Sequence, residues 1–191
     1  LRPEIIKDAA MEVRIKKITM GSLVQFFIIA AITVVFLLTS QSMIGLQFPM
    51  SLWMKIVFWQ GLGVGVFALL FYGLRKKYLG VFPRVALGLY QFQAFREVGL
   101  AIQKSLQQSD FHTLMALSDR RLIPLQRKAE NLLLRMQNQG EGGKHEIKEM
   151  IQEMWFLQEE ALQDFSQKLA ALKVIIIALF FLGSYLYGLM S

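Results

Sequence analysis

The chain has 191 residues, of which 54% are hydrophobic and 18% are charged, and its formal net charge is +7. A soluble domain typically has about a quarter of its residues charged, so this composition favours a membrane protein. The absence of cysteine excludes a disulfide framework and a zinc site built on thiolates.

Three segments without ionisable side chains predict membrane-spanning helices. They are Ile18–Ser40, Ile56–Leu74 and Val174–Met190. A helix needs about 20 apolar residues to cross a hydrocarbon layer of about 30 Å, and each segment has roughly that length. One such segment can be a core helix of a soluble protein, but three in a chain this short indicate membrane spans. The first exceeds the 7–15 apolar residues of a signal peptide. Because the sequence begins at Leu1, we expect that residues upstream are missing from it.

Basic residues beside the spans predict the orientation, because basic loops stay on the cytoplasmic side. Basic side chains lie before the first span and after the second, whereas the segment between these spans has only Lys55 at its far edge. We therefore expect a cytoplasmic N-terminus and an outward C-terminus. The expected parts are a cytoplasmic segment (1–17), a transmembrane hairpin (18–74), a cytoplasmic helical bundle (75–173) and a C-terminal transmembrane helix (174–191).

The spans contain no Asp, Glu, Lys, Arg or His. Proton relays and ion pathways usually place such groups at membrane depth, so the pattern disfavours a proton-driven motor or an ion pump. Gly61 and Gly65 form a G-x-x-x-G pair, and Ser184 and Gly188 form a similar pair of small residues. Because small residues let helix backbones approach closely, we expect both pairs to pack helices in the membrane.

The predicted fold class is all-α, with an antiparallel bundle between the second and third spans. No alternating apolar pattern in residues 84–173 is long enough for a strand. We expect one helix over about 84–108, with Ser109 and Asp110 as a stop or the next cap, and a second helical region that ends near Asn138. Pro124 belongs in the first turn of that second helix, or else kinks it. The segment "NQGEGGK" (138–144) then breaks the chain.

The last predicted helix begins near His145 and has one apolar face with the helical period from Ile147 to Leu172. No glycine, proline or turn pair separates it from the third span. We therefore predict one continuous helix through Lys173, which a kink at that residue would contradict. Movement of the bundle would then reach the membrane without a flexible linker.

No motif predicts catalysis. The chain contains no Walker A loop, G-x-G-x-x-G, G-x-S-x-G or H-E-x-x-H sequence. His112 and His145 lack partners at ligand spacing, so we expect no catalytic, cofactor-binding or metal-binding residue. Nucleic-acid binding usually requires aromatic platforms or a stronger basic face than residues 120–128 provide. A protein partner or lipid headgroups suit this cluster better than a nucleic acid.

Three pieces of sequence together resemble a known family. They are "FREVGLAIQKSL" (95–106), "LIPLQRKAENLLLRMQNQGEGGKHEIKEM" (122–150) and "FLQEEALQDFSQKLAALKVIII" (156–177). The second resembles a Leu-Phe-Pro helix that ends at Gly-Glu-x-x-Gly, with the matching positions Leu122, Pro124, Gly140, Glu141 and Gly143. The family comprises the F-type inner-membrane platform proteins of type II secretion and type IV pilus machines. The chain departs from it because Gln107–Arg121 is too short for the family's additional helical pair, and because no related cytoplasmic domain precedes the first span.

The resemblance implies a non-enzymatic scaffold that oligomerises with itself or with other inner-membrane subunits and contacts a cytoplasmic assembly ATPase. The residues that we expect to contact the ATPase as exposed charges are Arg120, Arg121, Arg127, Lys128, Glu153 and Glu160. The glycines expected to serve the turns and close packing are Gly99, Gly140 and Gly143. Two other classes of function stay open: a transporter or channel accessory subunit, and a membrane-anchored regulatory module.

Overall fold

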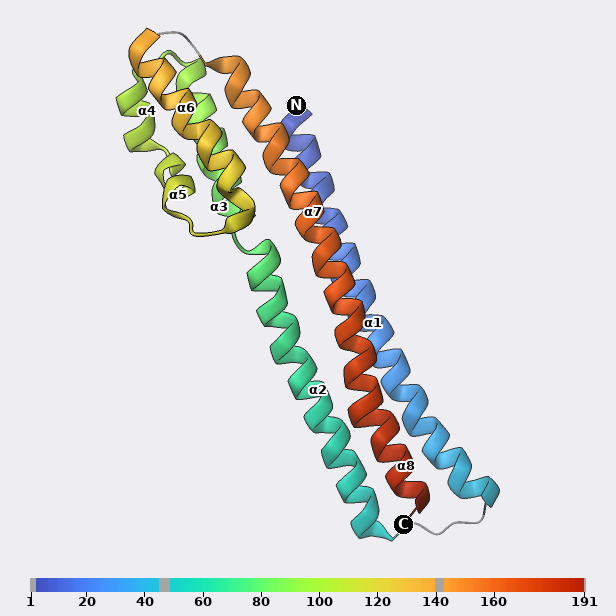
Figure 1. Ribbon diagram of the computed structural model, residues 1–191. Coiled ribbons are helices and arrows are strands. Elements are labelled where there is room, and N and C mark those ends of the chain that lie inside the picture. The colour runs from blue at the N-terminus through green and yellow to red at the C-terminus, as the bar shows by residue number, and fades with distance from the viewer. Residues whose placement is uncertain (1–2, 45–48, 140–142, 191) are drawn as a thin grey trace. The chain divides into compact units, whose positions relative to one another are not determined.

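The computed structural model describes residues 3–44, 49–139 and 143–190. These residues are helical almost throughout and include no strand, which confirms the all-α prediction for the part of the chain described. Figure 1 shows the elements in chain order: α1 (Pro3–Ile44), α2 (Met50–Leu79), α3 (Phe82–Glu97), α4 (Ile102–Gln108), α5 (Phe111–Ala116), the 3₁₀ turn η1 (Arg120–Leu122), α6 (Ile123–Gln139), α7 (Lys144–Ile176), the π-helical η2 (Ile177–Leu182) and α8 (Gly183–Met190).

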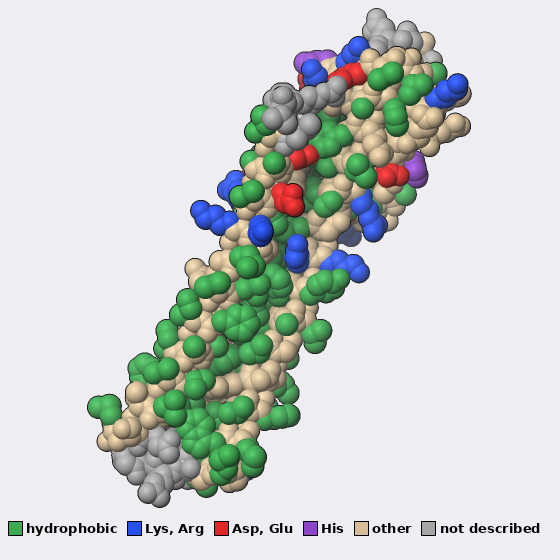
Figure 2. Space-filling view, turned by 180° about the vertical axis from the view of Figure 1, so that it is seen from behind, with side chains coloured by type: hydrophobic (Ala, Val, Ile, Leu, Met, Phe, Trp, Pro, Cys, Tyr) green, Lys and Arg blue, Asp and Glu red, His purple; other side chains and the backbone are tan. Residues whose placement is uncertain are grey.

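Three helical stretches are long and apolar enough to cross a membrane: Ile6–Ser40, Met50–Glu97 and Lys144–Gly188. Large hydrophobic side chains are exposed along them, among them Phe27, Phe36 and Leu69. In the space-filling view, hydrophobic side chains cover one long stretch of the visible surface, and no charged side chain interrupts it (Figure 2). Exposed apolar surface of this extent suits lipid rather than water, so the chain has the features of a multi-pass membrane protein.

The chain divides into two compact units. The first unit comprises Leu1–Leu74 and Phe165–Ser191, and the second comprises Arg75–Asp164. α2 and α7 each contribute to both units, and neither helix is interrupted where one unit ends and the other begins. α7 also continues through Lys173 without a break, as predicted, and the backbone changes to π geometry only at Ile177.

Aromatic side chains join the three long helices of the first unit. The ring of Phe26 in α1 stacks on Phe67 in α2, with centroids 3.9 Å apart and planes 9° apart. The same ring meets the edge of Phe181 in η2 at a centroid distance of 5.9 Å. All three side chains are buried. Because lipid is as apolar as these rings, close packing and not the exclusion of water holds such helices together.

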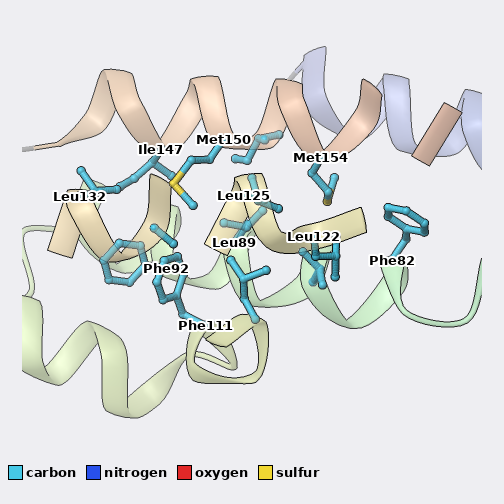
Figure 3. Packing of buried hydrophobic residues seen from close by; sticks show 14 of the residues in the cluster. Phe82, Leu89, Phe92, Phe111, Leu122, Leu125, Leu132, Ile147, Met150 and Met154 are labelled. Atoms are coloured by element: carbon cyan, nitrogen blue, oxygen red, sulfur yellow. The ribbon is translucent and has the colours of Figure 1, made fainter. Parts of the chain in front are cut away.

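The second unit has a hydrophobic core of its own, to which α3, α5, α6 and α7 contribute. Figure 3 shows Leu89 and Phe92 of α3, Leu125 of α6 and Met150 of α7 within it. The ring of Phe92 lies 4.5 Å from that of Phe111 in α5, measured between centroids. These residues follow the helical period of the sequence, which is why one face of each helix is buried.

The expectation of a single helix over 84–108 is wrong, because α3 ends at Glu97 and α4 begins at Ile102. Gly99 takes φ +87°. The Leu100 amide donates to the Phe95 carbonyl at 3.1 Å, and the Gly99 amide donates to the Arg96 carbonyl at 3.2 Å. This pair of bonds is the Schellman motif, which ends a helix where glycine accepts a left-handed backbone.

The second helical region is also divided, since α5 is a short separate helix before η1 and α6. Pro124 lies in the first turn of α6, as predicted, where its missing N–H costs no hydrogen bond. α7 begins at Lys144, one residue from the predicted start.

Candidate functional site

Arg121 links two parts of the second unit that are distant in sequence. Its Nη1 donates to the Tyr78 carbonyl at 3.1 Å and its Nη2 to the Lys77 carbonyl at 2.8 Å. These carbonyls belong to the last turn of α2, where helix carbonyls lack partners within the helix. The guanidinium also lies 5.4 Å from the centroid of the Tyr78 ring and 5.9 Å from that of Phe82, within the range of a cation–π contact.

Asp119 holds the Arg121 guanidinium in place. Its Oδ1 accepts from Nε at 3.0 Å, and its Oδ2 accepts from Nη2 at 2.6 Å. The hydrogen bond from the Arg121 side chain lowers the pKa of Asp119, and the same bond raises the pKa of Arg121. Only 28% of the Arg121 side chain is exposed. The expectation of an exposed charge is therefore wrong for Arg121, because its donors are directed at carbonyls of α2.

The other predicted contact charges lie on the surface of the second unit or close to it. Arg120, Arg127 and Glu160 are exposed. Lys128 of α6 pairs with Glu153 of α7, with 2.5 Å between Nζ and Oε2. The structure thus brings together one pair from the predicted set, with 57% of the Lys128 side chain exposed but only 21% of that of Glu153. The expectation of an exposed charge is therefore wrong for Glu153 as well.

A shallow hollow of about 190 Å³ adjoins this pair. It lies between α6 and the start of α7 and is lined by Lys128, Asn131, Leu132, Arg135, Glu146, Glu149 and Met150. We name it the α6–α7 groove. The groove carries charges of both signs around an apolar floor, a combination suited to a protein partner rather than to a simple anion or cation. The sequence did not indicate that Arg135, Glu146 and Glu149 belong to the groove, because the charged face of a helix does not show which neighbouring helix it borders.

The glycines expected to serve turns occupy different settings. Gly99 is open, with no other atom within 4 Å of the position that a Cβ would occupy, so only its positive φ requires glycine. Gly143 has φ +47°, and a Cβ there would lie 2.9 Å from Sδ of Met136. Gly140 lies outside the described residues. Gly88 was not anticipated: a Cβ there would lie 2.8 Å from the Asp110 carbonyl oxygen, so α3 and the turn before α5 approach closely.

In the first unit, Ser184 and Gly188 of α8 both lie at helix contacts. Ser184 Oγ accepts a hydrogen bond from Nε2 of Gln60 in α2 at 3.2 Å, and both side chains are buried. A Cβ at Gly188 would lie 3.1 Å from Cδ1 of Ile56. Such contacts let α2 and α8 approach closely at membrane depth.

Gly61 and Gly65 make no comparable contact within this chain. No other described atom lies within 4 Å of a Cβ built at either residue. Gly63 takes that role instead, since a Cβ there would lie 2.6 Å from the Cβ of Phe180 in η2. The three glycines alternate in "QGLGVG", and the sequence pattern alone cannot choose among them.

The structure joins the charge of Lys173 to a polar side chain inside the first predicted span. Lys173 Nζ donates to Oε1 of Gln25 in α1 at 2.9 Å. Gln25 lies eight residues beyond Lys17, which corresponds to about 12 Å along a helix axis. A lysine at that depth reaches its partner by extending its flexible stem, as long basic side chains do near the ends of membrane helices.

Among the described residues, no group of three or more His, Cys, Asp or Glu side chains is arranged to hold a metal ion. Comparison with known proteins finds no matching family, no matching curated protein and no matching solved structure. The likeness to the F-type platform proteins is therefore a hypothesis that depends on the three sequence pieces quoted above.

Proposed function

We propose that the chain is a non-enzymatic platform subunit of a secretion or pilus assembly machine in the bacterial inner membrane. In this proposal, the second unit is part of a cytoplasmic antiparallel helical bundle that contacts an assembly ATPase. The first unit transmits the resulting movement to subunits in the membrane, and the complete platform is an oligomer of this chain or of this chain with other membrane subunits.

The observation that supports the proposal best is the continuity of α7. This helix runs from the core of the second unit into the apolar first unit, and no loop interrupts it between Lys144 and Ile176. α2 likewise continues past Leu74. If a flexible linker joined the units, a displacement of the second unit would change only the conformation of the linker. A continuous helix instead transmits the displacement along its axis.

The contacts of Arg121 with α2 support the same proposal. Its guanidinium attaches the η1 segment to the last turn of α2 through two carbonyls. A displacement of η1 and of α6, which follows it directly, therefore acts on the end of α2 as well as on α7.

The α6–α7 groove is the surface that we assign to the ATPase. It joins Lys128 and Arg135 of α6 to Glu146 and Glu149 of α7. Charges of both signs in a fixed pattern set the specificity and the rate of protein association more than its affinity. Such a pattern suits a partner that must bind in one register and then release.

The proposal is tested by copurification of the full chain with the assembly ATPase of the same organism. Lys128→Glu combined with Arg135→Glu reverses two exposed charges of the groove without touching the Arg121 contacts. We expect the double variant to lose most of the recovered ATPase, because reversed charges oppose the partner's pattern. Lys104→Glu is the matched control, since Lys104 is equally exposed but lies in α4. Equal ATPase recovery from the wild type and the double variant would exclude this surface as the contact.

A further inference from the structure

The first unit contains a hollow that the proposed function does not use. Its volume is about 400 Å³, within the range of about 300–1,000 Å³ that small-molecule sites occupy. It lies between α2 and the η2–α8 segment and is lined by Lys55, Ile56, Trp59, Leu179, Gly183, Ser184 and Tyr187. We name it the Lys55 hollow.

The backbone of η2 borders the hollow. A π-helical segment departs from regular helix spacing, and such segments recur at functional sites. The indole Nε1 of Trp59 donates to the Leu179 carbonyl of η2 at 3.4 Å. At Gly183, a Cβ would meet only the Ala178 carbonyl oxygen, at 3.8 Å. The missing side chain of Gly183 therefore helps to keep the hollow open.

Lys55 supplies a positive charge without an acidic partner. The side chain is exposed, and the structure shows no ion pair or hydrogen bond for it among the described residues. The sequence has no Asp or Glu from residue 13 to residue 74 or from residue 165 to residue 191. No acidic residue of the first unit beyond Glu12 is therefore available to Lys55, in this chain or in a second copy beside it.

The aromatic residues of the hollow indicate its level in the membrane. Trp59 is 46% exposed and Tyr187 is 52% exposed. Tryptophan and tyrosine gather at the level of lipid headgroups, where one end of the side chain is in contact with apolar chains and the other with water. Lys55 lies one helical turn before Trp59 and directly before the apolar segment that begins at Ile56, so its ammonium is at the height of lipid phosphates.

We propose that the Lys55 hollow binds an anionic phospholipid, with the lipid phosphate against Lys55 and one acyl chain along Trp59, Leu179 and Gly183. Tyr187 lies eight residues after Leu179, which corresponds to about 12 Å along the helix axis, so the acyl chain enters the apolar layer from the headgroup level. A second copy of this chain fits less well, because its residues 13–74 and 165–191 contain no Asp or Glu to pair with Lys55.

The test is native mass spectrometry of the full chain in detergent, titrated with phosphatidylglycerol or with phosphatidylcholine. We expect the wild type to prefer phosphatidylglycerol. Lys55→Gln should reduce that preference about fivefold, the effect of one basic residue near a membrane surface. Lys104→Gln, which removes an exposed charge in α4 of the second unit, should leave the preference unchanged. An equal loss in both variants, or a loss in neither, would overturn the role of Lys55.

A second pair of variants tests the hollow itself. Gly183→Leu fills the space and should weaken the binding of both lipids. Gly65→Leu adds the same side chain to a part of α2 with no other atom within 4 Å, so lipid binding should persist. The helical circular dichroism of both variants is expected to match that of the wild type. If Gly183→Leu instead abolishes a dimer in the spectrum and leaves lipid binding intact, the hollow binds a second copy and the lipid proposal is wrong.

Discussion

Replacing Arg121 by alanine should destabilise the second unit by about 2–4 kcal/mol. A hydrogen bond from a charged donor contributes about 1.5–3 kcal/mol, and Arg121 makes two such bonds to carbonyls of α2. The pair with Asp119 adds only about 0–1 kcal/mol, because water still reaches both side chains, which are 28% and 23% exposed, and screens their attraction. Because 28% of the Arg121 side chain is exposed, the same screening keeps the expected destabilisation below the sum of the separate hydrogen-bond and ion-pair contributions.

The measurement is urea unfolding of the full chain in detergent micelles, followed by the fluorescence of Trp155. This residue belongs to the second unit, and its Nε1 donates to the Tyr90 hydroxyl at 3.1 Å. Trp53→Phe and Trp59→Phe in the background leave Trp155 as the only tryptophan. The lower stability of Arg121→Ala should appear as a lower urea concentration at the midpoint of unfolding, with an unchanged dependence of the unfolding free energy on urea concentration.

Two further variants separate the geometry of Arg121 from its charge. Arg121→Lys should recover only part of the loss, because an ammonium cannot reproduce the planar, bidentate contacts of a guanidinium. Arg120→Ala is the neighbouring control and should change the unfolding free energy by less than about 0.5 kcal/mol, as exposed substitutions usually do. If Arg121→Ala and Arg120→Ala had the same small effect, the link between η1 and α2 would contribute nothing to stability.

Three other predictions follow from the contacts described above. In the folded second unit, the hydrogen bond from Arg121 lowers the pKa of Asp119 below its ordinary value of 3.8. The ionised Asp119 therefore stabilises the fold fully above pH 3.8, and this contribution is lost as the pH falls through the lower, folded-state pKa. The unfolding free energy of Asp119→Asn, measured in urea, should lack this part of the acid dependence. Gly99→Ala should lower the unfolding free energy by about 1–2 kcal/mol, because φ is +87° there. Gly73→Ala, on the exposed face of α2, should instead raise it by about 0.5–1 kcal/mol. Equal unfolding free energies for the two variants would contradict this reasoning. In the proposed orientation, an impermeant maleimide should label Ser51→Cys in intact cells and Glu160→Cys only after the membrane is opened. Each variant then has a single cysteine, because the chain has none of its own. Labelling of Glu160→Cys in intact cells would show that the orientation is reversed.

Some features of the helices were predictable because their cause lies within a few neighbouring residues. The start of α6 follows from Pro124, whose ring suits only the first turn of a helix. The end of α3 was equally local, since Gly99 carries the signal of a left-handed cap. The prediction missed it because the apolar stripe continues beyond Gly99 to Leu106. Periodicity predicts which face of a helix is buried, but it does not show that the same face belongs to two helices.

The candidate sites were less predictable because their parts are far apart in the sequence. Arg121 belongs to a basic run that resembles an exposed cluster, yet its partners are carbonyls 43 and 44 residues upstream. Lys173 closes a charged helix, yet it donates to Gln25, 148 residues away. Nothing in the local sequence of either residue distinguishes a charge in water from one directed at another helix.

The sequence by itself therefore determined that the chain is helical, that three of its segments suit a membrane, and that α7 continues without a break from charged residues into an apolar span. Helix formation and transfer into lipid depend on residues that are adjacent in the chain. The tertiary structure alone decided that Gly63 rather than Gly61 or Gly65 meets η2, that Arg121 is tied to α2, and that a hollow lies beside Lys55. Those features depend on how helices distant in sequence pack against one another, since packing decides which side chains have neighbours and which remain open.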